Sequence, residues 1–158
     1  DFISAQGNAP MPVLFVTVGD KDFGDGREGY NLANPPADNQ VLERVEKWWQ
    51  LSGFLSDWIK TPGEGPGILI GINGSPGRQI VIASILIDRA AWKNSEDCPD
   101  GGGKIRVPTI AAPKLDAFGL RARRVDKAAG LAFEGIPAGF FIVLKTDGTL
   151  IGGRRPRN

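Results

Sequence analysis

Runs of apolar residues, separated by turn-forming segments, divide the chain into expected strands. Residues 12–18 are apolar and rich in β-branched side chains, as in a buried strand. Residues 67–72 and 79–87 flank an Asn-Gly turn within 73–77, and this pattern predicts an antiparallel hairpin. The second strand of this hairpin is apolar on both faces, so we expect it to lie in the middle of its sheet.

The second half of the chain carries weaker strand signals. Residues 140–144 and 149–151 lie on either side of an Asp-Gly turn and predict a closing hairpin. Residues 105–110 indicate a short strand, and Pro108 places it at a sheet edge because proline cannot donate to the ladder. Residues 115–131 are expected to form a short basic helix or an irregular arm.

One segment has the 3.6-residue spacing of an amphipathic helix. Asp38 is the expected N-cap. The apolar face would carry Val41, Leu42, Val45, Trp48 and Trp49, and the outward face Glu43, Glu46 and Lys47. Adjacent helical residues differ by about 100° in direction, so both Trp cannot enter one core. We expect Trp49 in the core and Trp48 on a ligand side near Arg44.

These elements predict an α+β fold, with a small curled antiparallel sheet or small barrel and one main helix. The chain lacks the alternating βαβ pattern of a doubly wound sheet, and it shows no internal repeat. Its length predicts a single domain over residues 1–158, with 1–10 and 152–158 as peripheral tails.

Composition excludes several chemistries. The chain has no His and one Cys, so a histidine-based triad, an imidazole zinc site and a dithiol redox centre cannot be built. The lone Cys98 favours a reducing, cytoplasmic setting. No apolar run approaches the roughly 20 residues of a membrane span, so we expect no membrane partner. We expect no metal and no cofactor.

Residues 19–36 form a loop rich in Gly, Asp, Asn and Pro. Counted from Asp20, the loop begins like a calcium-binding loop, but positions 5, 6 and 12 are Gly24, Asp25 and Asn31, which do not fit. A solvated acidic loop is the favoured interpretation, and a hard-cation site is the alternative. Asp88, at the end of an expected strand, is an isolated acidic candidate.

The near-zero net charge conceals a polarised chain. Residues 1–60 carry 5 basic and 9 acidic side chains (net −4), whereas 61–158 carry 14 and 9 (net +5). Within the second part, the basic side chains gather at Lys104, Arg106, Lys114, Arg121, Arg123, Arg124 and Lys127. This density is typical of elements that contact phosphates, and the four Trp supply flat faces for base stacking.

These features favour a non-catalytic nucleic-acid-binding domain that binds DNA or RNA. Two other classes stay open. A divalent-cation-dependent nuclease or hydrolase would use acidic residues, namely Asp20, Asp22, Asp25 and Asp88. A protein-interaction module would present a basic tail to an acidic partner through Arg154, Arg155 and Arg157.

Several segments also carry a family resemblance, in this order along about 15–130: Val13-Leu14-Phe15-Val16-Thr17-Val18, Arg44 with Trp48-Trp49, Ile68-Leu69-Ile70-Gly71-Ile72, Ile80-Val81 continuing to Ile87-Asp88 and Trp92, and Arg123-Arg124-Val125-Asp126-Lys127. This succession resembles the small β-rich domain appended to some GIY-YIG nucleases, which is similar to PUA, EVE and ASCH-like barrels. The chain departs from that pattern in its long loop at 19–36, and it lacks the nuclease motif itself.

The resemblance implies a PUA-like pseudobarrel that reads RNA or a flipped or modified DNA base in a pocket. It also implies an attached or associated nuclease as a partner. By the same resemblance Arg44, Trp48, Trp49 and Trp92 would line or flank the pocket. The residues expected to bind nucleic acid are Arg44, Trp48, Trp92, Arg121, Arg123, Arg124 and Lys127.

Overall fold

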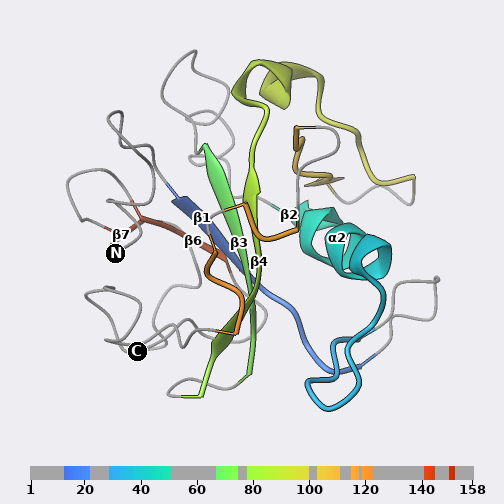
Figure 1. The fold of residues 1–158 in the computed structure, drawn as a ribbon. Helices are drawn as coiled ribbons and strands as arrows, with labels where there is room; N and C mark the ends of the chain where they lie inside the picture. The colour runs from blue at the N-terminus through green and yellow to red at the C-terminus, as the bar shows by residue number, and fades with distance from the viewer. Residues whose placement is uncertain are drawn as a thin grey trace, which may run out of the picture.

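The strand with the most continuous apolar sequence, β1 (Val13–Thr17), lies in the middle of the main sheet (Figure 1). The computed structural model describes residues 13–21, 29–50, 67–74, 78–99, 103–110, 115–117, 119–122, 141–144 and 150–151. Within these residues the sheet has five strands in the order β4-β3-β1-β6-β7. All five residues of β1 are buried, as expected for a strand covered on both faces.

The sheet is mixed, and the expectation of an antiparallel sheet is wrong. β1 pairs in parallel with β3 (Ile68–Asn73), in a register that places Phe15 opposite Ile70. The chain between them includes α2 (Asp38–Glu46), so β1, α2 and β3 form one βαβ crossover. A parallel pair needs such a crossover. The expectation failed because the single helix lies within a long connection that hides the βαβ pattern.

Both predicted hairpins are confirmed. β3 pairs antiparallel with β4 (Ile80–Leu86), with a shift in register between Gly71 and Ile72. β6 (Phe141–Leu144) pairs antiparallel with β1 on one side and with β7 (Leu150–Ile151) on the other.

Helix α2 is shorter than predicted. Ala37, not Asp38, is the residue at its N-cap, and no side chain caps it. The helix ends at Glu46, and Trp48 and Trp49 lie beyond it. Trp49 instead belongs to β2 (Trp49–Gln50), which pairs antiparallel with β5 (Lys104–Ile105). Aromatic residues favour extended backbone where a neighbouring strand is present. The pairing of Trp49 with β5 therefore ends the helix, although the apolar spacing continues.

Strand β4 lies at the edge of the sheet rather than in its middle, which corrects the prediction. Its free edge is covered by the described residues of the segments 108–110, 115–117 and 119–122, the last of which are drawn in orange beside β4 in Figure 1. Four backbone hydrogen bonds make this cover: Ile110 N to Leu86 O (3.1 Å), Ser84 N to Leu115 O (3.0 Å), Ala117 N to Ser84 O (2.8 Å) and Ala122 N to Val81 O (2.8 Å). The covered edge explains why an edge strand has a central strand's apolar sequence.

The expected strand at 105–110 is likewise mostly irregular. Only Ile105 belongs to a strand, and Thr109 forms an isolated bridge with Ile87. The described part of 115–131, up to Ala122, contains no helix. The rest of that segment, together with the tails 1–10 and 152–158, lies outside the described residues.

The core lies between the sheet and α2. It is built from Leu14, Val16, Val45, Leu69, Ala83, Ile85 and Trp92, with Leu42 and Trp49 packed against it. Trp92, on the 3₁₀ helix η1 (Arg89–Asn94), is 1% exposed and is among the largest fully buried side chains. Val45 of the helix lies directly over Gly71 of β3.

The described residues therefore form an α+β fold with a mixed sheet. Its two end strands, β4 and β7, do not pair with each other among these residues, so the sheet is open there. No helix in the described ranges combines the length and the apolar character needed to cross a membrane.

The contact between Gly71 and Val45 predicts the effect of adding one methyl group. A Cβ at Gly71 would lie 2.7 Å from Val45 Cγ2 and 3.3 Å from Ile82 Cγ1. Both side chains are fully buried, so Gly71→Ala should lower the free energy of unfolding by about 1–3 kcal/mol. Chemical denaturation measures this loss.

Gly19→Ala is the matched control, because its Cβ would meet only Arg44 Nη2, at 4.0 Å. Combining Gly71→Ala with Val45→Ala should cost less than the sum of the two single losses. Strict additivity would contradict the close approach of α2 to β3.

Candidate functional site

The C-terminal end of α2 carries a buried carboxylate. Glu46 is 2% exposed, and Arg106 Nη2 donates a hydrogen bond to its Oε1 at 2.7 Å. Thr109 Oγ1 donates a second, short hydrogen bond to its Oε2. The backbones also meet here, because Val107 N donates a hydrogen bond to Glu46 O at 2.9 Å. Glu46 thus holds residues 106–109 against the end of the helix.

The sequence predicted that Glu46 faces outward, and this is wrong. Helical spacing turns Glu46 about 100° away from Val45 and off the apolar face, but this side of the helix end is covered as well. The segment from Arg106 to Thr109 packs over the face that would otherwise be in solvent. In the sequence, this segment is a short apolar stretch with a single arginine. Such a pattern is too weak to predict that it would contact Glu46.

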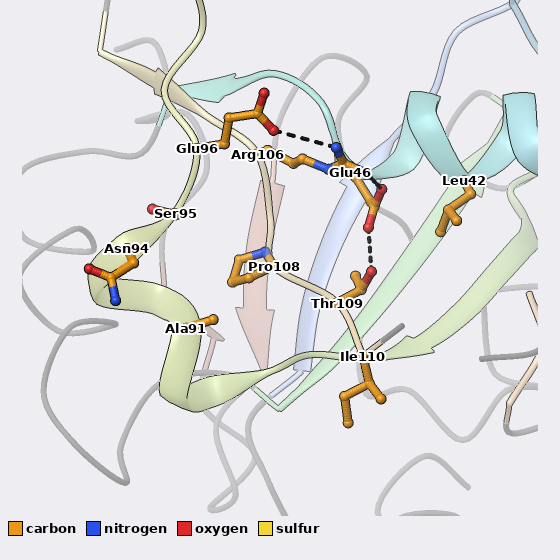
Figure 2. A pocket seen from close by; sticks show the side chains of 10 residues that line it. All are labelled: Leu42, Glu46, Ala91, Asn94, Ser95, Glu96, Arg106, Pro108, Thr109 and Ile110. Atoms are coloured by element: carbon orange, nitrogen blue, oxygen red, sulfur yellow. Dashed lines mark hydrogen bonds and ion pairs between the residues drawn. The ribbon is translucent and has the colours of Figure 1, made fainter. Parts of the chain in front are cut away.

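Arg106 joins two carboxylates. Its Nη2 contacts Glu46 and its Nη1 lies 3.4 Å from Glu96 Oε2, as the dashed lines in Figure 2 show. Burial alone would lower the pKa of Arg106, but the hydrogen bonds and charges of Glu46 and Glu96 outweigh it and raise that pKa above its ordinary value. The guanidinium therefore stays charged at every pH at which the protein is folded.

These three charged groups line a cavity of about 360 Å³ between α2, η1 and residues 106–110. Its wall consists of Leu42, Glu46, Ala91, Asn94, Ser95, Glu96, Arg106, Pro108, Thr109 and Ile110 (Figure 2). This volume lies near the lower end of the range of small-molecule pockets. None of its lining residues was among the binding residues expected from the sequence.

The expected pocket residues do not line this cavity. Trp92 is enclosed in the core, so neither face of its ring is open to a base. Arg44 is 7% exposed, and its Nη2 donates to the carbonyl of Lys21 at 3.4 Å. Both residues stabilise the interior of the fold.

The two adjacent tryptophans are both partly buried. Trp49 packs against the core, as expected, and its ring N–H donates to Val45 O at 2.8 Å. Trp48 has the Lys47 ammonium 5.4 Å from its ring centroid, a cation–π contact. Trp48 thus keeps part of its surface in solvent beside a positive charge.

Of the four basic residues Arg121, Arg123, Arg124 and Lys127 that were expected to bind nucleic acid, the structure describes Arg121. Its Nη1 lies 3.3 Å from Asp38 Oδ1, at the start of α2. Trp48 follows the other end of that helix, so about 12–15 Å of helix length separates it from Arg121. Arg123, Arg124 and Lys127 lie outside the described residues, as do Arg154, Arg155 and Arg157.

The acidic candidates for a cation site lie apart. Asp20 Oδ1 accepts a hydrogen bond from Asn73 Nδ2 at 2.9 Å, and Asn73 pairs with Ile80 at the start of β4. Asp88 follows the opposite end of β4, about 20 Å away along the strand. One ion cannot contact both. Asp22 and Asp25 lie outside the described residues, and the described ones contain no group of three potential metal ligands.

Comparisons of the chain with models of known protein families, with curated proteins and with solved structures gave no match. The function must therefore be inferred from the residues of this chain and their geometry.

Proposed function

We propose that the chain is a non-catalytic nucleic-acid-binding domain that holds the phosphates of DNA or RNA with the basic segment beginning at Arg121. One observation carries the proposal. The backbone immediately before this segment is fixed to the edge of β4, so the segment starts from a defined place and direction.

Asp116 provides that fixation. Its Oδ1 accepts hydrogen bonds from Ser84 Oγ at 2.7 Å and from Leu120 N at 2.8 Å, and its Oδ2 accepts from Arg121 N at 3.1 Å. Ala122 N then bonds to Val81 O at 2.8 Å. Ala122, the residue before Arg123, has a φ of 69°, in the left-handed region that non-glycine residues rarely adopt. Fixing the start of a basic segment lowers the entropy cost of phosphate binding.

Among the described aromatic residues, Trp48 is the best placed for stacking on a base. It is partly exposed, and the Lys47 ammonium, which also pairs with Glu43, lies over its ring. The distance of about 12–15 Å from Arg121 equals roughly four stacked nucleotides of one strand. We infer that a bound strand crosses α2 from Arg121 to Trp48.

The finer expectations rest on the family resemblance alone. They are a PUA-like pseudobarrel, a flipped or modified base held in a pocket, and an attached or associated nuclease. The cavity beside Glu46 has no aromatic residue in its lining, so we do not assign it to a stacked base.

The proposal predicts binding that weakens with salt, because phosphate contacts release counterions. Between about 50 and 200 mM salt, log Kd for an oligonucleotide should change linearly with log salt concentration. Arg121→Ala should lower the slope by about 0.7–0.9, and Arg123→Ala with Arg124→Ala by about twice as much. Fluorescence anisotropy measures these slopes.

Lys93→Ala is the charge-matched control. Lys93 is exposed on η1, at the other end of β4, and its loss should leave the slope unchanged. Salt-independent binding, or an equal effect of Lys93→Ala, would count against the basic segment as the phosphate site.

The Asp116→Asn substitution separates the effect of fixing the basic segment from the effect of the Asp116 charge on binding. The substitution removes a negative charge, which by itself would strengthen binding to nucleic acid. Its amide would face the N–H of Arg121 or that of Leu120, donor against donor, and loosen the segment. We expect affinity to fall about fivefold, equivalent to about 1 kcal/mol, in the same anisotropy titration.

Asp97→Asn removes the same charge at an exposed site and should leave affinity unchanged or slightly higher. If Asp116→Asn binds as tightly as Asp97→Asn, the fixation of the segment plays no part in binding.

A further inference from the structure

The cavity at the end of α2 has an acidic interior. Two carboxylates, Glu46 and Glu96, meet one guanidinium, Arg106, so the charged groups of the lining sum to −1. Arg106 already contacts both carboxylates, and its positive charge is neutralised within the wall. A phosphate or carboxylate ligand would meet net repulsion here.

The carboxylates have acceptor capacity left. An ionised carboxylate offers about four acceptor positions. Glu46 receives one hydrogen bond at each oxygen, from Arg106 and Thr109, and the side chain of Glu96 is 56% exposed at the rim. Asn94 and Ser95 add polar groups on the η1 side of the cavity. A cationic donor entering the cavity would therefore find acceptors at Glu96, Asn94 and Ser95.

The remaining wall is apolar. It consists of Leu42 from α2, Ala91 from η1, and Pro108 and Ile110 from residues 106–110 (Figure 2). Ile110 is 45% exposed, one of two large hydrophobic side chains with that much exposure in the described part of the chain. A ligand with an apolar body would cover Ile110, and this burial favours binding.

We propose that this cavity binds a small organic cation, in which an ammonium or guanidinium group is carried on a short apolar body. The charged group lies against the exposed carboxylate of Glu96 at the rim, and the apolar body packs on Pro108, Leu42 and Ile110. This site is distinct from the phosphate site at Arg121, because the net charge of its lining repels phosphates and it lies at the opposite end of α2 from Arg121.

The test uses the full chain with butylguanidinium as probe and the neutral butylurea, which has nearly the same shape, as comparison. Isothermal titration calorimetry should give saturable one-site binding of butylguanidinium with a Kd on the order of 0.1–1 mM. Butylurea should bind at least about tenfold more weakly, because it lacks the charge. Equal binding of the two probes, or no saturation by the cation, would overturn the proposal.

Substitutions locate the site. Glu96→Gln removes an exposed rim charge without disturbing the core, and it should weaken butylguanidinium binding about two- to fivefold. Glu43→Gln is the control, because Glu43 lies on α2 outside the cavity lining and pairs with Lys47. Equal affinities in Glu96→Gln and the unchanged chain would place the cation elsewhere and refute the assignment.

Two further titrations identify the source of the cation and test whether its binding is independent of nucleic acid. An arginine amide with a blocked amino group that binds as tightly as butylguanidinium would identify a peptide side chain as the ligand. Its rejection, with butylguanidinium still bound, would identify a free small molecule. An oligonucleotide should not displace butylguanidinium. Displacement would contradict the proposal that the cavity binds cations and repels phosphates.

Discussion

The buried carboxylate of Glu46 determines how residues 104–122 lie over the sheet. A carboxylate that is 3% exposed is costly unless charged or polar donors reach it. Arg106 and Thr109 supply those donors, so the chain must pass the end of α2 at this place. Beyond Thr109, the described residues Ile110, Leu115, Ala117 and Ala122 make backbone hydrogen bonds along the free edge of β4.

Three features of the molecule follow from this course. The hydrogen bonds of residues 110–122 to β4 close an apolar edge strand that would otherwise invite pairing with another chain. The same segment presents Asp116, which fixes the start of the basic residues. Finally, the gap left between α2, η1 and residues 106–110 is the acidic cavity. Edge protection, the proposed phosphate site and the proposed cation site therefore share one structural cause.

Local apolar patterning was enough to predict the strands and the hairpins. The strands β1, β3, β4 and β6 lie where continuous apolar runs indicated them, and the pairings of β3 with β4 and of β6 with β7 are the expected ones. The α+β class follows from these elements. Hairpins can be predicted because their pairing partners are neighbours in sequence.

What depends on distant partners could not be predicted. The parallel pairing of β1 with β3 spans a long connection, and β4 looks central only because residues 108–122 cover its edge. Trp48 and Trp49 follow helical spacing but leave the helix because β5 pairs with Trp49. Glu46 reads as a surface residue in sequence, and only its contacts with Arg106 and Thr109 reveal the cavity.

Hydrogen exchange in a Glu46→Gln variant tests the central role of this carboxylate most directly, with Glu43→Gln as the control one turn earlier. We expect the amides of Val107, Ile110 and Ala122 to lose protection together, by about ten- to a hundredfold, while those of β1 and β3 keep theirs. Unchanged protection at these three amides, or an equal loss across β1 and β3, would contradict it.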